Sequence, residues 1–322
     1  MAWRLRLAPE KTNIDFFRWQ WLTFGGSMSL TVFAIIAWAV MGLNFGIDFR
    51  GGTTIRTEST MAVDVGAYRT AMEGLDLGDV VITEVFDPSF RADQHVALIR
   101  IAPLDGIEAV TPEMIEAVED GLKAHDPAIK FPAVESVGPK VSGELVWSAI
   151  LAMVAATFCI LLYIWLRFEW QYALGAVLAL VHDIFITIGI FALFQIKFDL
   201  TIIAALLTIL GYSINDTVVV FDRLRENLMK YKMMPLRDVM NLSVNETLSR
   251  TLMTSVTTLI SLVALLIFGG DVMRGFAFAI TMGVLFGTYS SVYVAKNIVL
   301  ILGLDRSEKP KTGKGEFANI DA

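Results

Sequence analysis

Long apolar runs alternate with short polar segments along most of the chain, and one long polar stretch interrupts this pattern after the first run. The apolar runs cover residues 21–43, 145–166, 172–194, 200–221, 251–268 and 276–302. A helix of about 20 residues spans the hydrocarbon core of a bilayer, so the pattern predicts six transmembrane helices. The first run is too long for a cleavable signal and has no small-residue cleavage site after it, so we expect it to remain as an anchor.

Positively charged residues near the predicted helices lie mostly on one side of the membrane. Six crossings place the N-terminus 1–20, the loop 222–250 and the tail 303–322 on the same side, and these segments are rich in lysine and arginine. The short loops on the other side contribute only Lys197 and Arg274. Because loops rich in lysine and arginine stay in the cytoplasm, we expect both termini to be cytoplasmic and the long polar stretch to be external.

The external stretch, residues 44–143, lies between the first helix at 21–43 and helices two to six within 144–302, and its pattern is that of a small α+β domain. Its predicted strands and helices follow in the order βαββαβ, at residues 53–58, 62–73, 80–86, 95–101, 112–123 and 131–137. This order is that of a ferredoxin-like domain. His95 and His125 are far apart and have no further ligands at metal-site spacing, so we expect no metal site.

The predicted cytoplasmic loop 222–250 carries apolar residues at helical spacing among charged ones. These residues are Leu224, Leu228, Tyr231, Leu236, Val239 and Met240. Such a stripe favours an amphipathic helix lying at the membrane surface. A dedicated site for a partner protein is the alternative.

Composition agrees with a membrane protein and excludes several functions. With 55% hydrophobic and 18% charged residues among 322, the chain is too apolar for a water-soluble domain. The net charge of −7 and the absence of a basic stripe give no indication of nucleic-acid binding. The single cysteine, Cys159, cannot form an intrachain disulfide. No phosphate-binding loop motif is present, so we expect neither nucleotide hydrolysis nor a cofactor.

A few ionisable side chains fall within the predicted spans, where their cost usually indicates function. Asp183, preceded by His182, lies near the middle of the third helix. Asp216, preceded by Asn215, lies near the cytoplasmic end of the fourth. Lys296 lies a few residues from the cytoplasmic end of the sixth helix, so its ammonium group is expected to extend to the surface.

An arginine at the depth of Asp216 would allow the carboxyl group of Asp216 to bind and release a proton. The fifth apolar run is short, so its helix should draw Arg250 into the membrane boundary, near Asp216. A carboxyl group without a partner in lipid favours the protonated form, and a nearby arginine favours the charged form. We therefore predict that Asp216, with its neighbour Asn215, and Arg250 couple proton movement, and that Asp183 is a second, deeper step of the proton path. The alternative is a polar network that only joins helices.

Small residues in the spans indicate close packing. Gly283 and Gly287 form a GxxxG pair in the sixth apolar run. Such a pair marks either a close contact between helices or a contact face for a second subunit. The pattern does not distinguish the two.

Three segments resemble the motifs of a known family. The segment after the first run resembles the signature shared by SecD and SecF and contains Gly46, Asp48, Phe49, Arg50, Gly51 and Gly52. Residues 212–227, with Asn215 and Asp216, resemble the fourth-helix motif of SecF, and residues 245–251, with Arg250, resemble its entry to helix five. The chain is thus similar to the SecF family of the resistance-nodulation-division superfamily.

The resemblance implies a protein of the bacterial inner membrane that is not an enzyme. It implies pairing with SecD, association with the SecYEG channel and YajC, and a functional link to the SecA motor. It also implies that the proton motive force drives late steps of export, with proton-coupling residues at Asp216 and Arg250. The external domain would then be periplasmic and would receive the unfolded secretory polypeptide.

Two other functions fit parts of the pattern. A small-molecule or lipid exporter of the same superfamily typically carries duplicated halves with two large external domains, whereas this chain has one set. An intramembrane aspartyl protease would use Asp183 and Asp216, but residues 213–216 lack the Gly-x-Gly-Asp motif. The helical rise also puts the two aspartates at depths that differ by roughly 8 Å.

Overall fold

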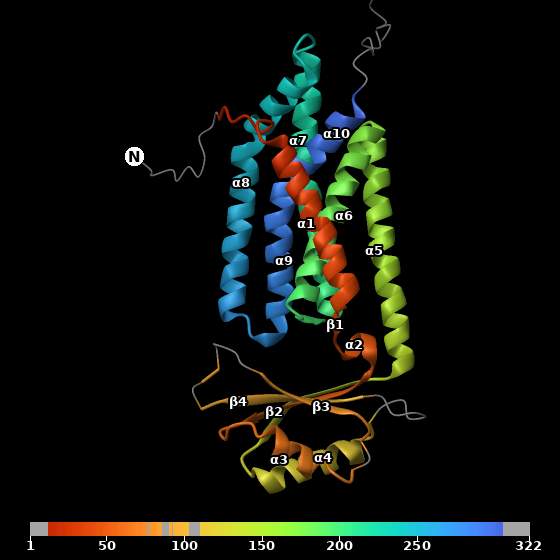
Figure 1. The fold of residues 1–322 in the computed structure, drawn as a ribbon, viewed down its shortest axis with the longest axis vertical. Helices are drawn as coiled ribbons and strands as arrows, with labels where there is room; N and C mark the ends of the chain where they lie inside the picture. The colour runs from red at the N-terminus through yellow and green to blue at the C-terminus, as the bar shows by residue number, and fades with distance from the viewer. Residues whose placement is uncertain (1–11, 76, 86–89, 92, 103–109, 305–322) are drawn as a thin grey trace, which may run out of the picture.

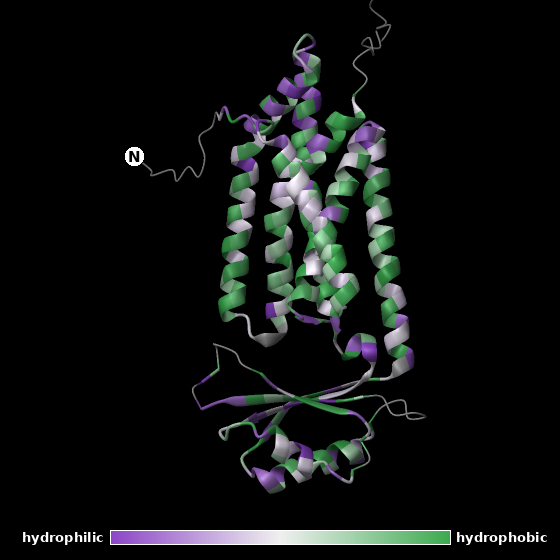
Figure 2. Cartoon of the chain, viewed as in Figure 1, coloured by the Kyte–Doolittle hydropathy of each residue, from purple (hydrophilic) through white to green (hydrophobic). Residues whose placement is uncertain are grey.

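The computed structural model describes residues 12–304 except residues 76, 86–89, 92 and 103–109. The described chain forms two parts, a bundle of long helices and a smaller α+β unit at one end of it (Figure 1). Apolar residues cover most of the long helices, while polar residues gather on the α+β unit and at the opposite end of the bundle (Figure 2). This distribution is the one expected where lipid surrounds the bundle and water surrounds its two ends.

The bundle contains six helical spans that are long and apolar enough to cross a membrane. Five are single helices, namely α1 (Gln20–Met41), α5 (Pro139–Arg167), α6 (Trp170–Leu193), α7 (Leu200–Lys230) and α8 (Leu236–Phe268). The sixth consists of α9 (Asp271–Ser290), the π-helical turn η1 (Ser291–Ala295) and α10 (Lys296–Leu302). The six spans predicted from the apolar runs are confirmed, whereas the apolar pattern gave no signal for the π-helical turn.

The prediction of an amphipathic helix at the membrane surface within 222–250 was wrong. Helix α7 continues to Lys230 and α8 already begins at Leu236, so the two form a helical hairpin that extends beyond the apolar runs. The apolar stripe is buried inside the protein, because Leu224, Val239 and Met240 pack together in one core cluster. The stripe therefore joins α7 to α8 and is not left for lipid.

Two pairs of helices in the bundle touch through glycines. A Cβ atom added at Gly283 would lie 2.3 Å from a side-chain carbon of Ile209, so α9 packs directly on α7. A Cβ atom at Gly189 would lie 2.3 Å from the Cβ of Ala34, so α6 packs directly on α1. Of the two explanations for the GxxxG pair at Gly283 and Gly287, the structure supports the close contact within the chain.

The α+β unit follows α1 and precedes α5. Its elements are β2 (Gly52–Ser59), α3 (Val65–Ala71), β3 (Val80–Val85), β4 (His95–Ile101), α4 (Pro112–His125) and β5 (Lys130–Val137). The strands form one antiparallel sheet in the order β3-β4-β2-β5. Helices α3 and α4 cover one face and bury Ile55, Ile99 and Leu122 against it. Side chains cap both helices, since Asp64 accepts from Gly66 N and Thr111 from Met114 N.

An N-terminal strap, residues 12–19, crosses the end of the bundle opposite the α+β unit (Figure 1). Two asparagines one turn apart on α8 hold its backbone. Asn245 accepts from Ile14 N at 2.8 Å, and Asn241 accepts from Phe16 N at 2.9 Å. Both amides also donate to Ile14 O. Because side-chain amides bind the backbone on both its donor and acceptor sides, the strap is fixed in register along α8.

Lys296 does not extend to the surface as predicted. Its side chain is 1% exposed, its Nζ donates to Phe16 O at 3.2 Å, and it lies 3.6 Å from the centre of the Phe17 ring. Aromatic rings attract a cation, and the strap carbonyl supplies an acceptor. The strap therefore gives Lys296 a partner within the protein, and the ammonium group has no need to reach the surface.

Candidate functional site

Asp216 lies on α7 where that helix passes α8. Its side chain is only 3% exposed, and its carboxyl group interacts with the guanidinium of Arg250 and with the side chains of Thr254 and Asn215. The ion pairs found among the described residues do not include Asp216 with Arg250, so their attraction acts across a gap. An attraction across a gap in low-dielectric surroundings remains sizeable and is easily altered by small helix movements.

Arg250 and Asn215 are exposed on the surface of the bundle, although both lie in spans. A charged or amide side chain that faces lipid at this depth is costly. The face formed by α7 and α8 around Asp216 is therefore suited to contact with water or with another protein.

Asp183 occupies a different place, inside the bundle. It is fully buried on α6, and its Oδ2 accepts hydrogen bonds from Ser213 at 2.7 Å and from Ser290 at 2.8 Å. Its Oδ1 lies 2.9 Å from Nδ1 of His182. The predicted site residues thus fall into two groups. Buried Asp216 lies beside exposed Arg250 and Asn215, whereas Asp183 lies in the interior with His182.

Ser213 connects the two groups, and no sequence pattern selects it as a site residue. It lies on α7 about one turn before Asp216. The same helix therefore carries both Asp216 and the serine that binds Asp183. Serines are common in apolar helices, and only the packing of α6, α7 and α9 shows which of them meet Asp183. The GxxxG pair indicated a close contact at Gly287, but only the structure shows that this contact is with Ser213, whose Oγ would lie 2.9 Å from an added Cβ.

The glycine-rich signature connects the α+β unit to α7. Its residues form the turn α2 (Ile47–Arg50) after β1 (Asn44–Phe45), which pairs in parallel with β6 (Lys197–Phe198). Asp48 Oδ2 accepts from Leu200 N at 3.0 Å, at the first turn of α7. An acidic side chain at a helix N-terminus satisfies a free N–H and interacts favourably with the helix dipole.

Two consecutive glycines then let the chain enter the sheet. Gly51 has a φ of 73° and Gly52 a φ of 104°, values at which residues with a Cβ are strained. Gly52 is also the first residue of β2, the strand that lies between β4 and β5. The signature therefore places a rigid joint between the sheet and the start of the helix that carries Asp216.

Comparisons with known proteins agree with the motifs. The model of the C-terminal region of the protein export membrane proteins SecD and SecF matches residues 117–305, and the model of the SecD/SecF GG motif matches residues 36–63. The protein translocase subunit SecF of Cereibacter sphaeroides is 71% identical over the whole of both chains. That of Rhodobacter capsulatus is 65% identical over 98% of this chain and 97% of its own.

Solved structures give the same assignment at lower identity. SecDF from Thermus thermophilus, described as a translocon-associated membrane protein, is 35% identical over 92% of this chain with a TM-score of 0.80. SecDF in a super-membrane-facing form is 36% identical over 93% of it with a TM-score of 0.66. This chain spans 39% of each SecDF chain, so it corresponds to one part of that longer protein. On the family models and the curated relatives together, the chain belongs to the SecF family of protein translocase subunits.

Proposed function

We propose that this chain is an accessory subunit of the bacterial protein-export translocase and that, with SecD, it uses the proton motive force to assist late steps of export. The observation that carries the coupling is Asp216, a buried carboxyl group in a span beside the fixed charge of Arg250. A carboxyl group can gain and lose a proton, and an arginine cannot, so protonation changes the attraction between α7 and α8. The proton is the coupling ion, and the mechanism needs no cofactor.

SecD is the partner that the bundle surface favours. The face that carries Asn215 and Arg250 needs polar contacts that lipid does not provide, and the similar SecDF structures contain more than this chain covers. From the resemblance of the motifs we further propose association with SecYEG and YajC, and a functional link to SecA. The substrate would be the unfolded secretory polypeptide, with no nucleic acid involved.

We also propose that the α+β unit is a ferredoxin-like periplasmic domain of the inner-membrane protein. Its antiparallel strand order and the two helices on one face support the fold. The lysine and arginine residues at the other end of the bundle support the orientation with both termini in the cytoplasm. Because the signature joins this domain to α7, a movement at Asp216 has a direct route to the periplasmic side.

Cysteine labelling tests the orientation. In a chain whose Cys159 is replaced by serine, a cysteine at Asp93 in the α+β unit should react with a membrane-impermeant reagent added to cells whose outer membrane is permeabilised. A cysteine at Lys232, in the turn between α7 and α8, should react only after the inner membrane is opened. Labelling of both positions from the periplasm would contradict the proposed topology.

An export assay tests the function. Inner-membrane vesicles lacking this chain should export a secretory precursor slowly, and restoring the chain together with SecD should accelerate export only while a proton gradient is present. An uncoupler should therefore remove the acceleration and leave the slower, ATP-driven export by SecA. An acceleration of equal size with and without the uncoupler would show that the subunit assists export without using protons.

A further inference from the structure

Five side chains form a continuous hydrogen-bonded chain inside the bundle, which we call the Asp183 network. Its members come from α1, α6, α7 and α9 and are all 6% exposed or less, namely Ser27, His182, Asp183, Ser213 and Ser290. Ser27 Oγ meets His182 Nε2, and His182 Nδ1 meets Asp183 Oδ1. The two remaining serines donate to Asp183 Oδ2. One carboxylate therefore links four of the spans.

The hydrogen bonds around Asp183 fit one protonation state of the pair formed by His182 and Asp183. A charged carboxylate only accepts, so it satisfies the two serine hydroxyls and an N–H at His182 Nδ1 together. The imidazole is then neutral, and its Nε2 accepts from the hydroxyl of Ser27. In this state, with one negative charge on the pair, every polar hydrogen of the network has an acceptor.

One added proton changes this pattern wherever it binds. A proton added to His182 gives its Nε2 a hydrogen. A proton added to Asp183 Oδ1 is donated to Nδ1, so the hydrogen of the neutral imidazole again lies on Nε2. In both cases Ser27 must turn from donor to acceptor. On Asp183 Oδ2 it makes that oxygen a donor, so either Ser213 or Ser290 must turn instead. Each position of the proton therefore reverses one serine and alters the link of α6 to α1, α7 or α9.

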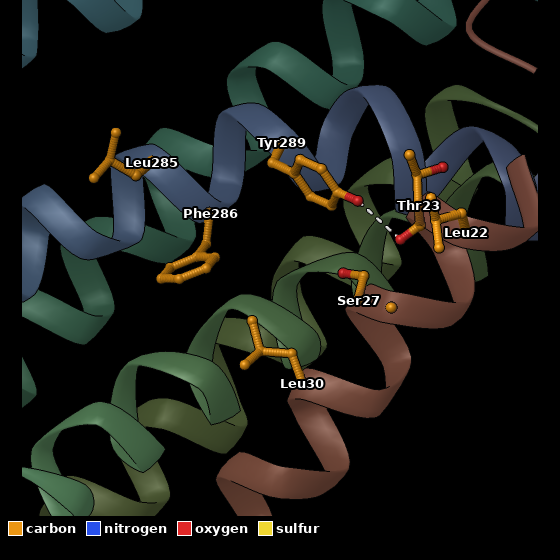
Figure 3. Close-up of a pocket in the computed structure, with 8 residues that line it drawn as sticks. Leu22, Thr23, Ser27, Leu30, Leu285, Phe286 and Tyr289 are labelled. Atoms are coloured by element: carbon orange, nitrogen blue, oxygen red, sulfur yellow. Dashed lines mark hydrogen bonds between the residues drawn. The ribbon is translucent and has the colours of Figure 1, made fainter. Parts of the chain in front are cut away.

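The space beside the network differs between its two ends. A Cβ added at Gly287 would lie 2.9 Å from Ser213 Oγ and 3.5 Å from Asp183 Oδ2. At the other end, Ser27 lies beside a pocket of about 360 Å³ between α1 and α9, which Tyr289 bridges by donating to Thr23 O at 2.8 Å (Figure 3). The packing is tight at α7 and loose between α1 and α9, so the hydroxyl group of Ser27 has room to reverse.

We propose that His182 and Asp183 are a second protonation centre of the coupling mechanism, which positions Asp216 through Ser213 and positions α1 through Ser27. The inference rests on the proposed proton coupling and adds to it the residues that transmit the charge change. Ser213 and Asp216 lie on the same helix about one turn apart, so a change in the first alters the rotation at which α7 presents the second.

Other ionisable groups on the neighbouring elements do not share in the network. The elements packed against α6 are α1, α5, α7, α9, η1 and α10. Apart from His182 and Asp183, the buried or half-buried ionisable residues on these elements and on α6 itself are Tyr172, Tyr212, Asp216, Asp222, Arg223, Arg274, Tyr289, Tyr293 and Lys296. Among the described hydrogen bonds and ion pairs, none joins any of these residues to His182 or Asp183. Among the described residues, the side-chain hydrogen bonds of His182 and Asp183 to other residues are therefore all made with serines.

The connection from Ser27 through His182 to Asp183 matches the order of partners in a catalytic triad, but the surroundings exclude that use. Acyl transfer needs free N–H groups aimed at the developing oxyanion. The N–H groups around Ser27 lie within α1, where they donate to carbonyl groups one turn earlier. The arrangement favours holding a proton over nucleophilic attack.

Ser27 provides the sharpest test, because the pocket beside it accepts an added methyl group. The complete complex with SecD, reconstituted in vesicles, should lose roughly tenfold in gradient-driven proton flux on Ser27→Ala, the size expected for one buried hydrogen bond. Ser27→Thr keeps the hydroxyl group and should retain the flux. Equal losses in both variants would show a packing effect and overturn the proposal.

Infrared difference spectra give a second measure that packing alone would not change. Imposing a proton gradient should change the carboxyl C=O absorption of the wild-type complex, and part of this change should vanish in Asp183→Asn while remaining in Asp216→Asn. If Ser27→Ala and Asp183→Asn both behave as the wild type while Asp216→Asn is uncoupled, the inference fails and the proposed function stands. If Asp216→Asn is also fully coupled, the residues of this chain do not carry the coupling, and a group in SecD must take that role.

Discussion

Replacing Asp216 with asparagine should abolish the acceleration of export by the proton gradient while the complex with SecD still assembles. Asparagine has the same shape as the neutral acid but cannot exchange a proton, so the attraction to Arg250 no longer alternates. One charge moved across the membrane yields about 2.3 kcal/mol per 100 mV, enough to shift a two-state equilibrium more than tenfold. The variant should lose this whole contribution in an export assay with and without uncoupler.

Asp222 offers a matched control on the same helix. Its side chain is 49% exposed and, among the described residues, forms an ion pair of 3.5 Å with Arg167. An exposed pair contributes at most about 1 kcal/mol, so Asp222→Asn should export like the wild type. If Asp216→Asn assembles normally and keeps its gradient-dependent export, Asp216 is not the coupling residue, and Asp183 or a group in SecD must take that role.

Replacing Gly189 with alanine should destabilise the bundle more than any other change that adds a single methyl group within the spans. The added Cβ would lie 2.3 Å from the Cβ of Ala34 and 2.6 Å from its Cα. Both atoms belong to Ala34, which has no flexible side chain to move aside, so α1 must separate from α6. Overpacking of this kind typically costs about 1–3 kcal/mol. Thermal unfolding of the purified complex in detergent should show a clearly lowered midpoint.

Gly25→Ala is the control for this change. Gly25 lies in α1 itself, and an added Cβ meets no atom within 4 Å. Alanine favours a helix over glycine by about 1 kcal/mol, so this variant should be as stable as the wild type or slightly more stable. A Gly189→Ala protein that unfolds at the wild-type temperature would mean that α1 and α6 are not packed closely in the membrane.

The local pattern of apolar and polar residues predicted those parts of the fold that each segment determines by itself. The apolar runs gave all six spans, because the cost of exposing polar backbone to lipid acts on each segment separately. The ends of α7 and α8 were missed, because the apolar stripe with Leu224 and Val239 reads the same whether lipid or another helix buries it. Only the hairpin geometry decides between the two.

In the candidate site, too, the sequence predicts local features but not the contacts between helices. Depth along each helix brought Asp216 and Arg250 to one level before the fold was known, since helical rise is a local property. Depth could not show that Arg250 is exposed, nor that Asp183 has Ser213 and Ser290 as partners. Those facts depend on how helices rotate against each other, and one residue of rotation changes which side chains meet.

The N-terminal strap has a consequence for how the chain is made. Its partners Asn241, Asn245 and Lys296 are synthesised long after it, with Lys296 separated from Phe16 by 280 positions. The ribosome delivers the N-terminus first, so Phe16 and Phe17, both buried in the finished protein, stay uncovered until the last span has emerged. The strap therefore completes its contacts only after both α8 and Lys296 have been synthesised, so one of the first segments to be made is among the last to reach its final packing.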